Sequence, residues 1–291
     1  MKLEDYKSGV YLTQYAYKSF SPSPINRQWV WEDAKVNTLL AEANRKLGSL
    51  DSFAHQVPDI DLFIETHIAK EAAQSSRIEG TQTEIEEAFV REASVAPERI
   101  NDWQEVRNYI EAINNSIENL VKLPVSTRML KDAHKILMRG VRGENKNPGE
   151  FRTSQNWIGG ATLQDAVYIP PAHTEIDELM SDLEKFLHND EIDVPVIIRA
   201  AIAHYQFESI HPFLDGNGRI GRLLIILYLV SAKMLTKPAL YLSDYFERNR
   251  ILYYDNLNRV RTHHDMIQWI KFFLAGIIQT SEHGIDTFRR I

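Results

Sequence analysis

Cysteine is absent from this chain of 291 residues. That absence excludes disulfide bonds, thiolate nucleophiles, and zinc or iron–sulfur sites with cysteine ligands. Glycine and proline are sparse, with 13 and 11 copies. Long apolar runs are missing too, because the longest, from Leu223 to about Lys233, is well short of the ~20 residues that a membrane-spanning helix needs. We therefore interpret that run as a buried helix and expect no membrane partner.

Positive charge is in deficit, since 33 lysines and arginines face 40 acidic residues and the net charge is −7. This balance disfavours broad binding to a nucleic-acid backbone but permits a local cationic site. The N-terminus has no apolar stretch behind a positive start, as a signal peptide would. With 44% hydrophobic residues, the chain can bury a core. These features predict a folded, cytoplasmic protein.

Apolar residues at helical spacing dominate the chain. Gly48 is expected to end the first helix, and Asp59 or Asp61 to cap the second. Thr83 with Glu86 has the spacing of a capping box for a short helix through Phe89, and Thr81 with Glu84 competes for this role. The predicted helices span about 29–50, 59–78, 83–89, 102–122, 126–139, 175–188, 195–209, 220–233, 244–261 and 266–279. The region 140–171 is rich in glycine and proline and predicts loops around a short β-hairpin, the only strands that we expect.

The segment from 211 to 222 carries the strongest chemical signal. It reads His-Pro-Phe-Leu-Asp-Gly-Asn-Gly-Arg-Ile-Gly-Arg and precedes a strongly apolar helix. Gly216 and Gly218 allow backbone N–H groups to converge at the start of that helix, which is a favourable place for an anion. Arg219 and Arg222 are three residues apart, so we expect two guanidinium groups on one side of the first turn. Such a pair suits a polyphosphate.

The other polar residues of this segment extend the hypothesis. Asn217 adds an amide donor, and Asp215 could hold Mg²⁺, which bridges phosphates through one or two carboxylates. His211 titrates near neutrality and could accept a proton. Each feature alone would fit an ordinary turn and a solvated surface. Eight specified residues at fixed offsets have a chance on the order of 10⁻¹⁰ per window, which favours a functional site.

The segment resembles the Fic family signature, HxFx(D/E)GNGRxxR, at every specified position. Fic-domain proteins are mostly protein adenylyltransferases, which move AMP from ATP to a hydroxyl of a target protein. The resemblance implies that His211 is the general base, that Asp215 holds Mg²⁺ and that Arg222 holds the γ-phosphate. It assigns the anion hole to Gly216, Asn217, Gly218 and Arg219. A branch that transfers phosphate has lysine at the second glycine, so Gly218 favours AMP transfer.

A second, weaker motif lies upstream, in Ser75-Ser76-Arg77-Ile78-Glu79-Gly80. Taken alone it is an ordinary helix end. It also resembles the Fic inhibitory motif, (S/T)xxxE(G/N), through Ser75, Glu79 and Gly80. The resemblance implies that Glu79 pairs with Arg222 and makes that arginine unavailable to ATP. We therefore expect an autoinhibited enzyme.

Two further regions resemble Fic proteins. The stretches 149–152, 157–160 and 167–171 are similar to the Fic flap, a hairpin that docks an extended target segment by adding a strand. We assign to this flap Val167, Tyr168, Ile169 and Pro170. The simpler alternative is a surface hairpin. The resemblance also implies that Tyr253 or Tyr254 flanks the adenine, and the alternative there is an aromatic core residue.

Together these features predict an all-α Fic helical bundle with a small β-hairpin flap. Residues 1–100 would form an N-terminal helical region with the inhibitory helix, and residues 101–291 the catalytic core with its C-terminal helices. The predicted function is autoinhibited transfer of AMP from ATP, with Mg²⁺, to a Ser, Thr or Tyr hydroxyl of target proteins. Self-modification and a homodimer are further hypotheses.

Two alternative functions stay open at this stage. One is a nucleotide-binding regulatory or toxin–antitoxin-like module with little turnover. The other is a metal-dependent phosphohydrolase that uses His211 and Asp215. Hydrolytic removal of AMP is included in this second alternative, because the carboxylate of Glu79 could orient a water molecule.

Overall fold

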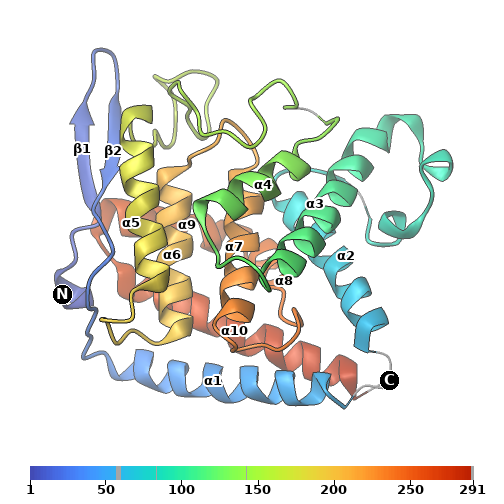
Figure 1. The fold of residues 1–291 in the computed structure, drawn as a ribbon. Coiled ribbons are helices and arrows are strands. Elements are labelled where there is room, and N and C mark those ends of the chain that lie inside the picture. Colours follow the sequence, from blue (N-terminus) through green and yellow to red (C-terminus); the bar gives the residue numbers. More distant parts are fainter. Residues whose placement is uncertain (57–59, 83, 142, 290–291) are drawn as a thin grey trace.

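Helices build most of the molecule (Figure 1). The computed structural model describes residues 1–56, 60–82, 84–141 and 143–289. The α-helices of these ranges are α1 Ala34–Ala54, α2 Ile60–Ile78, α3 Ile100–Asn119, α4 Thr127–Leu137, α5 Ile176–His188, α6 Val196–Ile210, α7 Asn217–Ser231, α8 Ser243–Arg248, α9 Arg250–His263 and α10 Met266–Phe288. Short 3₁₀ helices span Leu3–Asp5, Glu86–Phe89, Glu92–Ser94, Pro97–Arg99 and His173–Glu175. The all-α prediction is confirmed.

The strands do not lie where the sequence predicted them. β1 (Gly9–Thr13) and β2 (Lys18–Pro22) form an antiparallel pair near the N-terminus, with Tyr11 opposite Phe20. Four of the five residues of β1 are exposed, so the strand lacks the apolar alternation that would have predicted it. The hairpin expected around 167–169 is instead a loop with one isolated bridge, between Ile158 and Tyr168.

The longest helices, α1 and α10, lie along one another at the base of the molecule (Figure 1). The prediction that Gly48 ends the first helix is wrong, because α1 continues to Ala54. Glycine inside a helix costs about 1 kcal/mol, and burial of Leu50 and Ala54 offsets it. An ion pair of 2.5 Å between Lys46 and Glu282 joins the two helices. Packing on α1 also explains why α10 extends beyond the predicted end at 279.

The centre of the bundle is formed by α6 and α7, which pack against each other. Nearly every residue of both helices is buried. The loop 211–216 connects them, so it is held between two core helices. α7 begins at Asn217, three residues earlier than predicted, and α2 packs beside it and against α3 and α8. The motif of the loop and the motif at the end of α2 are therefore brought together.

The single helix predicted over 244–261 is two helices. α8 ends at Arg248 and α9 begins at Arg250, and the Asn249 side chain donates to the carbonyl of Tyr245 at 2.9 Å. The Tyr245 carbonyl also accepts from the backbone N–H of Asn249 at 3.1 Å, so both groups of Asn249 close the end of α8. The expected caps Asp59 and Thr83 lie outside the described residues, whereas Asp61 lies inside α2 and Glu86 begins a 3₁₀ helix. Every helix in the described ranges is too short or too polar to span a bilayer.

Candidate active site

The loop 211–216 has a fixed shape. His211 ends α6 in the left-handed conformation, with φ of 51°. The buried guanidinium of Arg152 donates from Nε to the His211 carbonyl (3.0 Å) and from Nη2 to the Pro171 carbonyl (2.6 Å). The Asn217 side chain accepts from the N–H of Phe213 (2.8 Å) and donates to its carbonyl (2.9 Å). The Asn217 side chain, predicted as a donor of the anion hole, therefore also braces the loop.

His211 has the properties of a neutral base. It is half-buried, and its Nδ1 atom has no hydrogen-bond partner among the described residues. Burial lowers the pKa of His211 to about 4, and the charges of Arg261 and Arg152 act in the same direction. A histidine with this pKa is uncharged at pH 7. It can therefore accept a proton there.

A second histidine supports the loop from α4. The His134 ring stacks on Phe213 with centroids 3.9 Å apart, and its Nδ1 accepts from the backbone N–H of Gly149 at 2.8 Å. Its Nε2 must then carry the proton, which it donates to the carbonyl of Asp215 at 3.0 Å. Burial lowers the pKa of His134 to about 4, so this arrangement persists at neutral pH.

Asp215 stands at the rim of the loop with its side chain 37% exposed. One carboxylate oxygen accepts from the N–H of Gly216 at 2.7 Å, and the other contacts the ammonium of Lys146 at 2.8 Å. Burial acts to raise the pKa of Asp215, but the hydrogen bond and charge of Lys146 outweigh it, and the pKa is lowered. Asp215 is thus an anionic group that already faces a cation. Nothing in the sequence had singled out Lys146.

The start of α7 presents free backbone donors. Its first helical hydrogen bond runs from the N–H of Ile220 to the carbonyl of Gly216 at 3.1 Å, so the N–H groups of residues 217–219 have no acceptor within the helix. The carboxylate of Glu79 lies directly over this turn. A side chain at Gly218 would collide with its Oε1 atom, which only a glycine allows to approach so closely. A carboxylate therefore stands where the sequence predicted an anion.

Glu79 also meets Arg222, as the resemblance implied. The Arg222 guanidinium, 1% exposed, donates from Nη2 to Glu79 Oε1 at 2.7 Å. Its Nε donates to Ser75 Oγ at 2.8 Å, and Nη2 donates to the Ser75 carbonyl at 2.9 Å. Burial acts to raise the pKa of Glu79, but the charge and hydrogen bond of Arg222 outweigh it, and the pKa is lowered. Ser75, Glu79 and Arg222 thus form one contact between α2 and α7.

The first arginine of the motif, Arg219, points elsewhere, which corrects the expected pair of guanidinium groups. Arg219 is 5% exposed and donates to Glu105 of α3 at 3.1 Å. Its backbone carbonyl accepts from the hydroxyl of Tyr109 at 3.0 Å. Its charge is therefore balanced by Glu105, and only its backbone N–H faces the anion position. Glu105 escaped sequence reasoning because an acid on a predicted helix is usually solvated.

Glu208 is another buried acid of this region, on α6, three residues before His211. Its Oε1 atom has no hydrogen-bond partner among the described residues. Burial raises the pKa of Glu208 to about 7, against the opposing charge of Arg222. The sequence did carry a signal for it, an acidic residue in a helix whose other residues are mostly apolar.

The two candidate tyrosines have different surroundings. Tyr253 is buried in an aromatic cluster, stacked on Phe246 at 4.5 Å, and its hydroxyl bonds His204 Nε2 at 2.9 Å. It is a core residue, so its ring is not available to an adenine. Tyr254 is 41% exposed. Burial of its hydroxyl and the charge of Glu79 raise the pKa of Tyr254 to about 12, against the opposing charge of Arg222, so Tyr254 lies near both residues. Only Tyr254 therefore remains a candidate for stacking on a base.

The flap residues fall into two groups. Val167 is 75% exposed, whereas Tyr168, Ile169 and Pro170 are buried. The Tyr168 hydroxyl donates to the carbonyl of Ser209 at 2.6 Å, and its ring lies under the guanidinium of Arg261 at 3.8 Å. β2 holds the same segment from the other side of the chain, because the N–H of Phe20 donates to the carbonyl of Ile169 at 2.9 Å. The predicted flap is therefore anchored beside the histidine loop, with the side chain of Val167 exposed next to the bridge between Ile158 and Tyr168.

Comparison with known proteins identifies the fold and the family. Residues 37–118 match the family described as Fic/DOC family N-terminal, and residues 124–229 match the Fic/DOC family. The chain belongs to the Fic/DOC family. It is 28% identical over 235 residues to a protein adenylyltransferase Fic of Drosophila erecta, which covers 75% of this chain and 45% of that protein. The chain thus matches less than half the length of this relative.

Solved structures of Fic proteins share the fold. A Fic family protein from Desulfovibrio desulfuricans superposes with a TM-score of 0.73 at 25% identity, over 91% of this chain and 78% of that one. A Fic-domain signaling protein from Bacteroides thetaiotaomicron gives 0.65 at 17% identity, over 88% and 97%. The Fic match at 124–229 contains the whole histidine loop, and the N-terminal match contains Ser75 and Glu79.

Proposed function

We propose that this Fic protein transfers AMP from ATP to a hydroxyl group of a protein, and that Glu79 holds it inactive. The observation that carries the proposal is the Glu79 carboxylate, which lies over Gly218 and is bonded to Arg222 at 2.7 Å. The site thus accepts an anion at the start of a helix next to a neutral histidine. The name of the Drosophila relative supports the reaction class.

The chemistry follows from the positions of these groups. The hydroxyl oxygen of the target attacks the α-phosphorus of ATP, a new O–P bond forms, and the bond to pyrophosphate breaks. His211, neutral at pH 7, accepts the hydroxyl proton. The N–H groups at the start of α7 stabilise the charge on the transferred group. Arg222 orients the polyphosphate once Glu79 has left it.

The residues at the rim fit Mg²⁺. Asp215 offers a partly exposed carboxylate that already faces the ammonium of Lys146, so the position tolerates positive charge. One carboxylate together with phosphate oxygens is a usual environment for this ion. When it is bound with ATP, Mg²⁺ neutralises phosphate charge, and Asp215 would hold it. We place this activity in the cytoplasm, because a chain without cysteine needs no oxidising compartment for disulfide bonds.

Labelled ATP tests the reaction class. In the Glu79→Gly background, we expect label from the α position to remain on protein, at minimum on the chain itself. Retention of γ-label would instead indicate phosphate transfer, and release of free phosphate would indicate hydrolysis. Addition of His211→Ala should lower α-label incorporation by about 10²–10⁴-fold, as for loss of a general base. His263→Ala, which removes an exposed histidine, is the matched control.

A further inference from the structure

The hairpin of β1 and β2 leaves one strand edge open. β1 stands outside β2 at the edge of the molecule (Figure 1). On its inner side β2 is held by the predicted flap, through the hydrogen bond of 2.9 Å from Phe20 to Ile169. In the part of the chain that the structure describes, β2 is the one strand paired with β1. The outer side of β1 is therefore free for a further strand.

The register shows which backbone groups face outward. In an antiparallel pair, opposite residues alternate between exchanging both N–H···O bonds and exchanging none. The N–H of Gln14 donates to the Tyr17 carbonyl at 2.8 Å, so this pair is bonded. Tyr11 lies opposite Phe20, whose N–H points away from β1 to the flap. Tyr11 and, two residues on, Thr13 thus direct their N–H and carbonyl groups away from β2.

β1 lacks the features that usually protect a strand edge. Its sequence, Gly-Val-Tyr-Leu-Thr, has neither lysine nor proline. Val10, Tyr11 and Leu12 are between 39% and 58% exposed. The Tyr11 ring packs edge-on against Phe20 with centroids 5.2 Å apart, which holds the strand in shape. An ordered edge of this kind is a template for pairing with another chain.

Positive charge surrounds this edge. Lys7 directly precedes β1, and Lys18 begins β2 opposite the last residue of β1. Neither lysine forms an ion pair with any residue in the described ranges. Burial raises the pKa of the Tyr11 hydroxyl, and the charge that opposes this effect is that of Arg261. Three cations are therefore close to the strand.

One acid is bonded to the sheet, and it lies on the side of β2. Glu175 accepts from Ser21 Oγ at 2.5 Å and from the N–H of Ala172 at 3.1 Å, so its position is fixed by hydrogen bonds. Three cations against one carboxylate leave the hairpin positive. A second copy of the chain would bring a hairpin of the same charge to this edge. An acidic segment of another protein would complement it.

We propose that β1 binds an extended, acidic segment of a partner protein by strand addition. The backbone of the segment exchanges hydrogen bonds with Tyr11 and Thr13. Its apolar side chains cover Val10 and Leu12, and acidic residues near its ends face the two lysines. This surface lies outside the loop 211–216 and is tested without nucleotide. Failure of the proposed AMP transfer is therefore distinguishable from failure of the surface.

Strand peptides test the surface on the full chain. One probe alternates valine and threonine, has glutamate at each end and is blocked at both termini, and a matched probe has lysine ends. Calorimetry at low salt should show at least about fivefold tighter binding of the glutamate probe, and high salt should reduce the difference. Equal affinities of the two probes would overturn the proposal. So would absence of binding of the glutamate probe up to about 1 mM.

A third probe tests strand addition itself. The glutamate peptide with its amides N-methylated keeps its side chains and charge but has no backbone donors. We expect no binding of this probe in the same concentration range. An affinity equal to that of the parent peptide would show that charge alone is responsible and would refute strand addition.

Variants locate the binding. Thr13→Pro removes an outward N–H and leaves the bonds between β1 and β2 in place, because proline is tolerated where a strand N–H faces solvent. It should weaken the glutamate probe at least about tenfold, whereas Thr13→Ala, which keeps the N–H, should change the affinity less than about twofold. Lys18→Glu should remove the preference for glutamate ends. Equal affinities of Thr13→Pro and Thr13→Ala would refute the placement. If Thr13→Pro fails to fold, the N-methylated probe retains the test.

Self-association is the competing use of this edge. Sedimentation velocity of the wild type and of Thr13→Pro distinguishes it, and we expect the same species in both. A wild-type dimer that Thr13→Pro abolishes would show that a second copy covers β1, which would overturn the proposal.

Discussion

Replacing Glu79 by glycine should convert the protein from an inactive to an active state. The substitution removes the carboxylate that covers Gly218 and occupies Arg222. Two hydrogen bonds from Arg222 to Ser75 remain, so the guanidinium keeps its position and gains a free donor. Glu79 lies just after the last residue of α2, so glycine interrupts no helical turn. We therefore expect a gain in ATP binding without loss of the fold.

The size of the gain follows from the contact. Hydrogen bonds to charged groups contribute about 1.5–3 kcal/mol net, and the Glu79 side chain is 35% exposed, so solvent places this pair in the lower half of the range. A value of about 2 kcal/mol corresponds to roughly 30-fold in an equilibrium constant. At ATP concentrations far below saturation, the rate of AMP transfer should rise by this factor.

The assay is the initial rate of α-label incorporation into protein at low ATP. Glu86→Gly, which removes an exposed carboxylate of the same segment, is the control and should change the rate less than about twofold. Thermal unfolding of each variant verifies that it is folded. A Glu79→Gly rate equal to that of the wild type would refute the inhibitory role. A gain in Glu86→Gly as large as that in Glu79→Gly would show that loosening of the segment is responsible.

Three other predictions concern single groups of the site. In Glu79→Gly, kcat/KM should stay flat from pH 8 to pH 6, because the pKa of His211 is lowered to about 4 and the base remains neutral; an acid limb near pH 6.5 would contradict this. Lys146→Ala should lower the Mg²⁺ concentration for half-maximal activity by up to about fivefold, because the lysine competes with Mg²⁺ for Asp215 and this partly exposed ion pair contributes at most about 1 kcal/mol. A higher Mg²⁺ requirement would show instead that Lys146 assists binding. Glu105→Ala should lower the free energy of unfolding by about 3–5 kcal/mol in denaturant titrations, because it leaves the buried charge of Arg219 without its partner. A decrease below about 1 kcal/mol would refute the structural role of the pair.

Helix positions were largely predictable because they depend on local patterns. The periodic apolar residues predicted the positions of α3 to α7 with end points wrong by at most a few residues, because one face of each helix packs into the core. The errors arose where packing overrode local preference. Gly48 remains helical because α10 buries the turns after it, and β1 was missed because its side chains are mostly exposed.

The sequence by itself determined the family, the loop of the site and, through resemblance, the pairing of Glu79 with Arg222 across 143 residues. These features are encoded in residues at fixed short spacings. Tertiary structure alone decided which groups of the site remain available. Arg219 is neutralised from α3, the Asn217 side chain braces its own loop, and Tyr253 is buried in the core.

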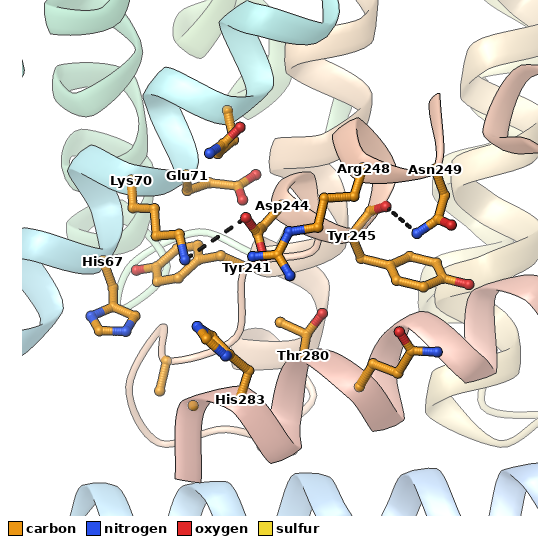
Figure 2. A pocket seen from close by; sticks show the side chains of 14 residues that line it. His67, Lys70, Glu71, Tyr241, Asp244, Tyr245, Arg248, Asn249, Thr280 and His283 are labelled. Carbon is orange, nitrogen blue, oxygen red and sulfur yellow. Dashed lines mark hydrogen bonds and ion pairs between the residues drawn. The ribbon is translucent and has the colours of Figure 1, made fainter. Parts of the chain in front are cut away.

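The physical reason is that a spacing places a side chain on a face of its helix but does not select its partner. The partner depends on which other helix packs there, and that helix can lie more than a hundred positions away, as Glu105 does for Arg219. A pocket beside α2 is of the same kind, because its lining side chains come from α2, α8 and α10, which only their packing brings together (Figure 2).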